Sequence, residues 1–196
     1  FKCDELNGDA IDLINGYNGT LFGGIQQGVQ GKIGNAYSFD GVDDYVNLGN
    51  NPNFQLNKGT LSCWVKSNDF GSGFTRFIVK NNAFGLLTKD NKLITYDFFS
   101  KITRNTNINI ADDVWHHLVL KFDSGTTNGT NIYLDGLNVL STTITIDAQS
   151  YPLIIGASHN NIQFVKAIID ECVIFNKILS MTEISNIYNN GNGITI

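Results

Sequence analysis

The stretch GNAYSFDGVDDYV, residues 34–46, decides the fold class of this chain. Closely spaced apolar residues occupy positions 36–39, and a second extended run starts at Tyr45. Between the two runs, Asp40-Gly41 supplies residues that tolerate a positive φ, which tight turns between strands require. The stretch therefore predicts a strand, a turn and a second strand.

Similar runs recur along the chain, separated by Gly, Asn and Asp residues that mark turns. We predict strands over residues 36–39, 45–48, 59–66, 75–80, 84–88, 92–98, 115–122, 130–134, 137–142, 151–155 and 167–175. About eleven short strands without helical stretches between them indicate a sandwich rather than an α/β fold. Residues 8–35, rich in Gly and Asn, predict a long irregular segment with brief extended pieces.

One helix is predicted, near the C-terminus. Ser180 stands at its N-cap and Glu183 at the third helical position, which completes a capping box. Ile184, Ile187 and Tyr188 then form an apolar stripe at helical spacing. We expect this short helix to pack over one end of the sandwich, with Tyr188 in the core.

The composition limits the classes of function. A chain of 196 residues with 42% hydrophobic residues suits one large all-β domain with a sizeable core. The net charge of −5 and the lack of Lys or Arg clusters argue against nucleic acid as a partner. No run approaches about 18 apolar residues, so we expect no membrane insertion. The opening FKCDELNGD lacks the features of a signal peptide, so no signal peptide is expected in this chain.

The three cysteines show no metal-ligand spacing. Cys63 and Cys172 lie in apolar strand patterns, which favours buried thiols. A disulfide between Cys3 and Cys172 would require the first and last strands to be neighbours. Because the count is odd, at least one thiol stays free.

Six motifs along the chain stand in the order expected of one family. They are GNAYSFDGVDDYV (34–46), GTLSCWVK (59–66), WHHLV (115–119), IYLDG (132–136), IIG (154–156) and IDECVIFNKILSMTEI (169–184). Together they resemble the laminin-G-like jelly roll of the concanavalin A-like lectin/glucanase superfamily. The resemblance implies an all-β, two-sheet antiparallel jelly-roll sandwich with one short C-terminal helix, as a single domain over residues 1–196. His117 is then expected in the core or at a strand edge, and His116 at the surface.

The same superfamily contains glycoside hydrolases, so catalysis has to be considered. Such enzymes need two carboxylates across the scissile bond, roughly 5–5.5 Å apart for retention or 6.5–9.5 Å for inversion. In the glucanase branch they come from one strand that carries Glu-x-Asp-x-Glu. Glu5, Glu171 and Glu183 fit no such pattern, and no nucleophile elbow, phosphate loop or HExxH motif is present. We therefore expect no enzymatic activity.

A metal site is a separate hypothesis, which the resemblance favours because jelly rolls of this type often carry one calcium ion. Calcium takes six to eight oxygen ligands. We expect a structural Ca²⁺ held by Asp12 and Asp170 with backbone carbonyls, and Asp40 as a further ligand. In the alternative, Asp12 caps a turn and Asp170 accepts hydrogen bonds from loop amides. Both interpretations remain open.

Two loops have the chemistry of sugar recognition, in which rings cover C–H patches and polar groups bond hydroxyls. One combines aromatic residues with an arginine and the Asn-rich run NTNIN, and the other is a polar loop after the motif IIG. The predicted ligand-binding residues are Tyr96, Phe98, Arg104, His159, Asn160 and Asn161. Trp64 either lines the concave sheet or is covered by the N-terminal segment, and we favour the second.

The sequence therefore predicts a non-catalytic binding module that recognises carbohydrate or a cell-surface ligand such as a glycoprotein. The parent protein would be a larger adhesin, a secreted enzyme or a viral attachment protein, located outside the cell or at a surface. The alternative is a protein–protein adhesion or structural domain, for which an exposed apolar patch would be the discriminating feature.

Overall fold

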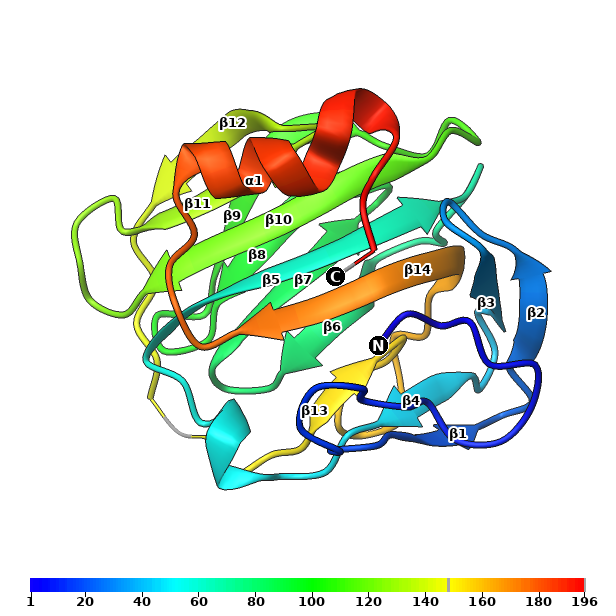
Figure 1. The fold of residues 1–196 in the computed structure, drawn as a ribbon. Helices are drawn as coiled ribbons and strands as arrows, with labels where there is room; N and C mark the ends of the chain where they lie inside the picture. The colour runs from blue at the N-terminus through cyan, green and yellow to red at the C-terminus, as the bar shows by residue number, and fades with distance from the viewer. Residues whose placement is uncertain (148, 196) are drawn as a thin grey trace.

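Two antiparallel sheets of seven strands each face one another in the computed structural model, which describes residues 1–147 and 149–195 (Figure 1). Sheet I has the spatial order β1 (Thr20–Phe22), β4 (Tyr45–Asn47), β13 (Leu153–Ile155), β6 (Phe74–Lys80), β7 (Phe84–Lys89), β8 (Lys92–Asp97) and β9 (Ile102–Asn109). Sheet II has the order β12 (Leu137–Thr142), β11 (Thr130–Leu134), β10 (His116–Asp123), β5 (Lys58–Lys66), β14 (Lys166–Phe175), β3 (Asn35–Asp40) and β2 (Gln26–Gln30). This arrangement confirms the predicted jelly-roll sandwich.

The main core fills the space between the sheets. Leu61, Cys63 and Val65 on β5 alternate with outward-facing residues, as the period of a strand requires. From the other sheet, Phe84 on β7 stacks on Phe122 of β10 with ring centroids 4.3 Å apart. These inward side chains are fully buried, which removes their apolar surface from water and holds the two sheets together.

Most predicted strands are present within one or two residues of their expected ends, with one difference. Residues 8–35 contain β1 and β2, which are the brief extended pieces expected there. The Asn-rich run is not a loop but part of β9, the edge strand of sheet I. Because one face of this edge strand is open to water, polar residues occupy much of it. The sequence therefore lacks the apolar run that would indicate a strand.

The predicted helix is α1 (Met181–Tyr188), and the capping box at Ser180 and Glu183 is confirmed. Its position differs from the expectation. Ile184 and Ile187 pack against Val119 and Tyr133, so α1 covers the outer face of sheet II across β10 and β11 rather than one end of the sandwich (Figure 1).

Trp64 lies on this same covered face of sheet II. Its side chain is only 2% exposed, and the ring of Tyr188 stacks on it with centroids 5.9 Å apart. The ammonium of Lys32 lies 4.8 Å from the ring centroid, so the N-terminal segment contributes to the cover, as expected. The C-terminal segment supplies the larger part through Tyr188 and Gly193.

The adjacent histidines have different surroundings. His117 is buried beside Trp64 and its Nε2 lies 2.8 Å from the hydroxyl of Ser62. His116 is not exposed as expected, because its ring lies between the carboxylates of Asp135 and Asp112, at 2.8 and 3.1 Å. Burial lowers the pKa of His117 to about 4, whereas the hydrogen bond to Asp135 raises the pKa of His116.

Cys63 and Cys172 are buried free thiols, as expected, and Cys3 is also buried and free, so the disulfide considered between Cys3 and Cys172 is not formed. Cys3 lies beside Cys172, so the N-terminal segment and β14 are neighbours. The hydrogen bond with Cys172 and burial raise the pKa of Cys3 well above its usual range. The contact with Cys3 lowers the pKa of Cys172, but the hydrogen bond with Cys63 and burial outweigh it, so this pKa is raised as well.

In the part of the chain that the structure describes, no helix has both the length and the apolar composition that crossing a bilayer would require.

Histidine titration tests the packing of the covered face. At pH 5, we expect His117 to remain neutral while His116 is protonated, as read from ring carbon shifts in NMR spectra. As pH falls below about 6.5, His117 takes up a proton in the unfolded chain but stays neutral in the folded chain. Protonation therefore favours the unfolded state, and the free energy of unfolding decreases as pH falls toward the folded pKa of about 4. A midpoint for His117 near 6.5 would contradict the burial of its ring.

Candidate functional site

The outer faces of the two sheets are covered differently. The helix α1 covers sheet II. The other helical elements of the described residues are two short 3₁₀ turns, η1 (Pro52–Phe54) and η2 (Asn189–Gly191). Neither turn contributes to the apolar cluster on sheet I. That cluster consists of Val79, Ile154 and Ala157, with half-buried Tyr45, Phe98 and Phe164 packed against it. The outer face of sheet I therefore carries an apolar centre that only rings and loops cover.

A row of three rings spans this face. Phe74 on β6 and Tyr96 on β8 meet edge to face with centroids 5.8 Å apart, although β7 lies between their strands. Strands two apart are separated by about 9.6 Å, so the rings must lean across β7. Tyr96 in turn meets Phe98 at 5.0 Å. We call Phe74, Tyr96 and Phe98 the aromatic row.

Arg76 lies within this face. Register pairs it with Leu87 on β7, and Leu87 with Ile94 on β8, so the three share the outer side of sheet I. Arg76 is only 8% exposed, and its guanidinium carbon lies 5.8 Å from the centroid of Phe98. Its Nε donates to Oε1 of Gln163 at 2.7 Å, while its buried Nη1 has no partner among the described residues.

The loop of residues 157–164 is held against β6 at two points. Gln163 accepts the hydrogen bond from Arg76, and the backbone amide of His159 donates to Asn81 at 3.2 Å. Asn161 and Gln163 both adopt a left-handed conformation, with φ of 52° and 60°, which costs energy for residues other than glycine. Asn160, next to Asn161, is exposed at the tip.

Two polar atoms of this loop lack partners within the protein. The hydroxyl of Ser158 and Nδ1 of His159 are both buried without a hydrogen bond. The His159 ring lies against Tyr151 with centroids 3.9 Å apart, and burial lowers its pKa. Buried polar groups are rarely left unsatisfied in native proteins, so each such atom calls for an explanation.

Five of the six predicted ligand-binding residues are brought to this face and the loop beside it: Tyr96, Phe98, His159, Asn160 and Asn161. Arg104 is not among them. Register pairs it with Thr95, whose side chain is fully buried, so Arg104 faces the interior and bonds Asp97 at 3.3 Å. The sequence reasoning missed Arg76 as a site residue, although a cation inside the apolar run FTRFIVK was a visible signal.

The carboxylates predicted to bind metal lie at different places. Asp12 accepts hydrogen bonds from the amides of Ile14, Asn15 and Tyr17, and these bonds outweigh desolvation and lower its pKa. Asp170 is buried within β14 and accepts from the amide of Ile33 at 2.9 Å. Burial raises its pKa to about 6. Both carboxylates thus hold loop amides, as the alternative interpretation describes.

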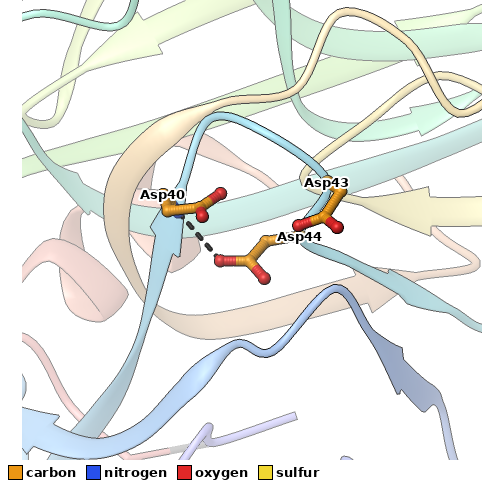
Figure 2. Close-up of side chains that lie close together, drawn as sticks. All are labelled: Asp40, Asp43 and Asp44. Carbon is orange, nitrogen blue, oxygen red and sulfur yellow. Dashed lines mark hydrogen bonds between the residues drawn. The ribbon is translucent and has the colours of Figure 1, made fainter.

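Asp40 belongs instead to a group with Asp43 and Asp44 in the turn between β3 and β4 (Figure 2). One ligand oxygen from each carboxylate lies within 4.8 Å of the others. Oδ2 of Asp44 accepts from the amide of Asp40 at 2.9 Å, while its buried Oδ1 has no partner. Burial and the two neighbouring carboxylates raise the pKa of Asp44. In the described ranges, neither Asp12 nor Asp170 joins this group.

A separate hollow of about 450 Å³ lies between the N-terminal segment and β14. Tyr17 and Phe54 line it with rings that meet edge to face at 5.8 Å, and Ile14 and Phe175 add apolar surface. Its lining contains amides but no carboxylate, histidine or basic group. The hollow therefore lacks the charged group that distinguishes the outer face of sheet I.

Residues 40–185 match the Laminin_G_3 family model, described as the concanavalin A-like lectin/glucanases superfamily. No curated protein matches the sequence significantly.

Solved structures with the same fold include parts of enzymes and of toxins. A sialidase from Trypanosoma rangeli in complex with sialic acid aligns with 97% of this chain at 14% identity and a TM-score of 0.70. The receptor binding domain of a botulinum neurotoxin C/D mosaic aligns with 90% at 17% identity and a TM-score of 0.67. This chain spans only 32% and 47% of those two chains.

A third solved structure is of similar size to this chain. Domain 4 of AbnA, an extracellular arabinanase from Geobacillus stearothermophilus in complex with arabinotriose, aligns with 90% of this chain. The match covers 88% of that domain, at 20% identity and a TM-score of 0.65. All three likenesses show the fold alone.

The two arginines should respond oppositely to replacement by methionine, which keeps a long apolar side chain. Arg76→Met should leave the free energy of unfolding unchanged or raise it by up to about 2 kcal/mol, because a buried cation without an acidic partner is removed. Arg104→Met should lower it by about 1–2 kcal/mol, because buried Asp97 loses its partner. Urea unfolding measures both, and a marked loss in Arg76→Met would show that this guanidinium stabilises the fold.

Proposed function

The chain belongs to the laminin-G-like family of the concanavalin A-like lectin/glucanase superfamily, and on that premise we propose that it is a non-catalytic carbohydrate-binding module. We place the binding surface on the outer face of sheet I. The aromatic row, beside Arg76 and Gln163, is the observation that carries the proposal.

The chemistry of this face suits a sugar. Half-buried rings offer flat apolar surfaces to the C–H patches of a pyranose or furanose. Hydroxyl and amide groups flank them, because Thr103 pairs with Tyr96 and Asn105 pairs with Ile94 on the edge strand β9. Gln163 lies on the opposite flank. Such groups donate to and accept from sugar hydroxyls, so the ligand would lie over the rings between them.

The structural neighbours support a binding role. Domain 4 of the arabinanase was solved with arabinotriose, and the toxin domain is described as receptor binding. Both are domains of larger proteins, an extracellular arabinanase and a neurotoxin. By analogy, we propose that this module serves an extracellular or surface-associated protein, such as an adhesin, a secreted enzyme or a viral attachment protein, with a glycan or glycoprotein as its partner.

The three glutamates have no catalytic arrangement around this face. Glu183 caps α1 and its pKa is held at about 2 by Lys177 and Ser180. Glu171 is buried within β14, which raises its pKa to about 7, and Glu5 accepts from the amide of Ile11 at 3.1 Å. The proposal therefore includes binding without turnover.

A protein partner is the alternative function, and one observation favours it. Leu6, Leu13 and Ile14 in the N-terminal segment are 70%, 65% and 76% exposed. Exposed apolar side chains of this size are typical of contact surfaces when they form a patch.

We further propose that a structural Ca²⁺ binds at Asp40, Asp43 and Asp44. Carboxylate oxygens are the ligands that calcium prefers, and the unpartnered Oδ1 of Asp44 is a buried oxygen that a cation would satisfy. A bound calcium would offset the repulsion among the three carboxylates and tie β3 to β4. It would thereby stabilise the start of β4, the strand that carries Tyr45.

Glycan binding is tested on a glycan array, followed by isothermal titration of the best-bound sugar. Tyr96→Ala and Phe98→Ala should each weaken binding about tenfold or more, because each removes a ring from the ligand surface. Phe99→Ala is the matched control, since Phe99 is adjacent, 60% exposed and outside the aromatic row. Equal loss in all three variants would place the ligand at the loop tip, and unchanged binding in the first two would exclude this face.

Calcium binding is tested by thermal unfolding with calcium and with EDTA. Calcium should raise the melting temperature of the natural chain, since a ligand at a hundredfold excess over its Kd contributes about 2.7 kcal/mol. Asp44→Asn should abolish this response. Asp12→Asn, which removes a turn cap, should lower stability but keep the response. Loss of the response in Asp12→Asn instead would support the site that the sequence predicted at Asp12 and Asp170.

A further inference from the structure

Arg76 is a cation without a counterion. The ion pairs formed by described residues use Lys66, Arg104, His116 and Lys177, and none of them involves Arg76. Burial lowers the pKa of Arg76 to about 10, so the group is still charged at neutral pH. Its surroundings are the ring of Phe98 and the amide of Gln163. Neither neutralises a full positive charge.

A second cation lies on the same face. The ammonium of Lys89 lies 5.2 Å from the centroid of Phe74, at the far end of the aromatic row from Phe98. The row is thus flanked by two cations, in a chain whose net charge is −5. Because the chain as a whole is acidic, the two cations on this ring-lined surface are not part of a general excess of basic residues. Their position favours a ligand with a negative charge.

The hydrogen bonds of Arg76 leave one edge of its guanidinium free. Nε is held by Gln163, which fixes the plane of the group, while Nη1 is buried with no partner in the protein. The remaining edge carries Nη1 and Nη2, two parallel donors whose spacing matches the two oxygens of a carboxylate. Because Nη1 is buried, a contact of a carboxylate with both donors would require Gln163, which has a positive φ, to move aside with its loop.

The inference that follows names the class of sugar for the function proposed above, and it rests on that function. We propose that the glycan bound by this module carries a carboxylate, as uronic or sialic acids do, and that Arg76 binds that carboxylate while the aromatic row covers the sugar ring. Arg104, the other arginine of the chain, does not take this part, because it faces the interior and is paired with Asp97.

The test compares sugars that differ only in the carboxylate. Trigalacturonic acid and sialyllactose are each paired with their own methyl esters in isothermal titration with the full chain. At least one acidic sugar should bind about ten- to a hundredfold more tightly than its neutral partner. That preference should disappear in Arg76→Met, return in part in Arg76→Lys, which keeps the charge but not the fork, and persist in Arg104→Met. Rising salt should weaken binding of the acidic sugar more than that of the neutral one.

The possible outcomes distinguish failure of the role of Arg76 from failure of carbohydrate binding. Equal binding of acidic and neutral partners, a preference that survives in Arg76→Met, or array binding to neutral or sulfated sugars alone would overturn the role of Arg76 and leave carbohydrate binding intact. Silence of the folded natural chain toward every sugar on the array would overturn carbohydrate binding itself. Circular dichroism of each variant shows that it is folded before the comparison is made.

Discussion

Both sheets of this sandwich carry apolar side chains on two faces, and the protein must cover each face from water. The inner faces of the two sheets pack against one another and exclude water. On the outer side of sheet II, α1 buries Val119 and Tyr133. On the outer side of sheet I, no helix of the described residues takes that place, and Val79 and Ile154 are covered by rings and a loop. That difference is the reason that we propose the ligand-binding surface on sheet I.

Some polar groups among the residues that cover sheet I have no hydrogen-bond partner. Nη1 of Arg76, the hydroxyl of Ser158 and Nδ1 of His159 are buried without protein partners, within one region of one face. Unsatisfied buried groups lower stability, and natural proteins tolerate them where function uses them. In the function that we propose, a ligand on this face would supply partners for these groups and offset part of that cost.

The sequence predicts the layers of this fold better than it predicts which way individual side chains face. Apolar runs and turn residues are local signals, so the strands and the capped helix follow from them. Facing depends on register, and one residue of slip moves a side chain to the other side. A bulge between Arg76 and Ile78 lets Phe77 and Ile78 both face the core and turns Arg76 outward, whereas register turns Arg104 inward.

The most direct test of the account is where a bound sugar perturbs backbone amides. Amide ¹H–¹⁵N spectra of the chain, recorded as sialyllactose or trigalacturonic acid is added, map the contact surface residue by residue. We predict shifts confined to β6, β7, β8, β9 and residues 157–164. Shifts around the hollow lined by Tyr17 and Phe54, with the outer face of sheet I unchanged, would contradict it.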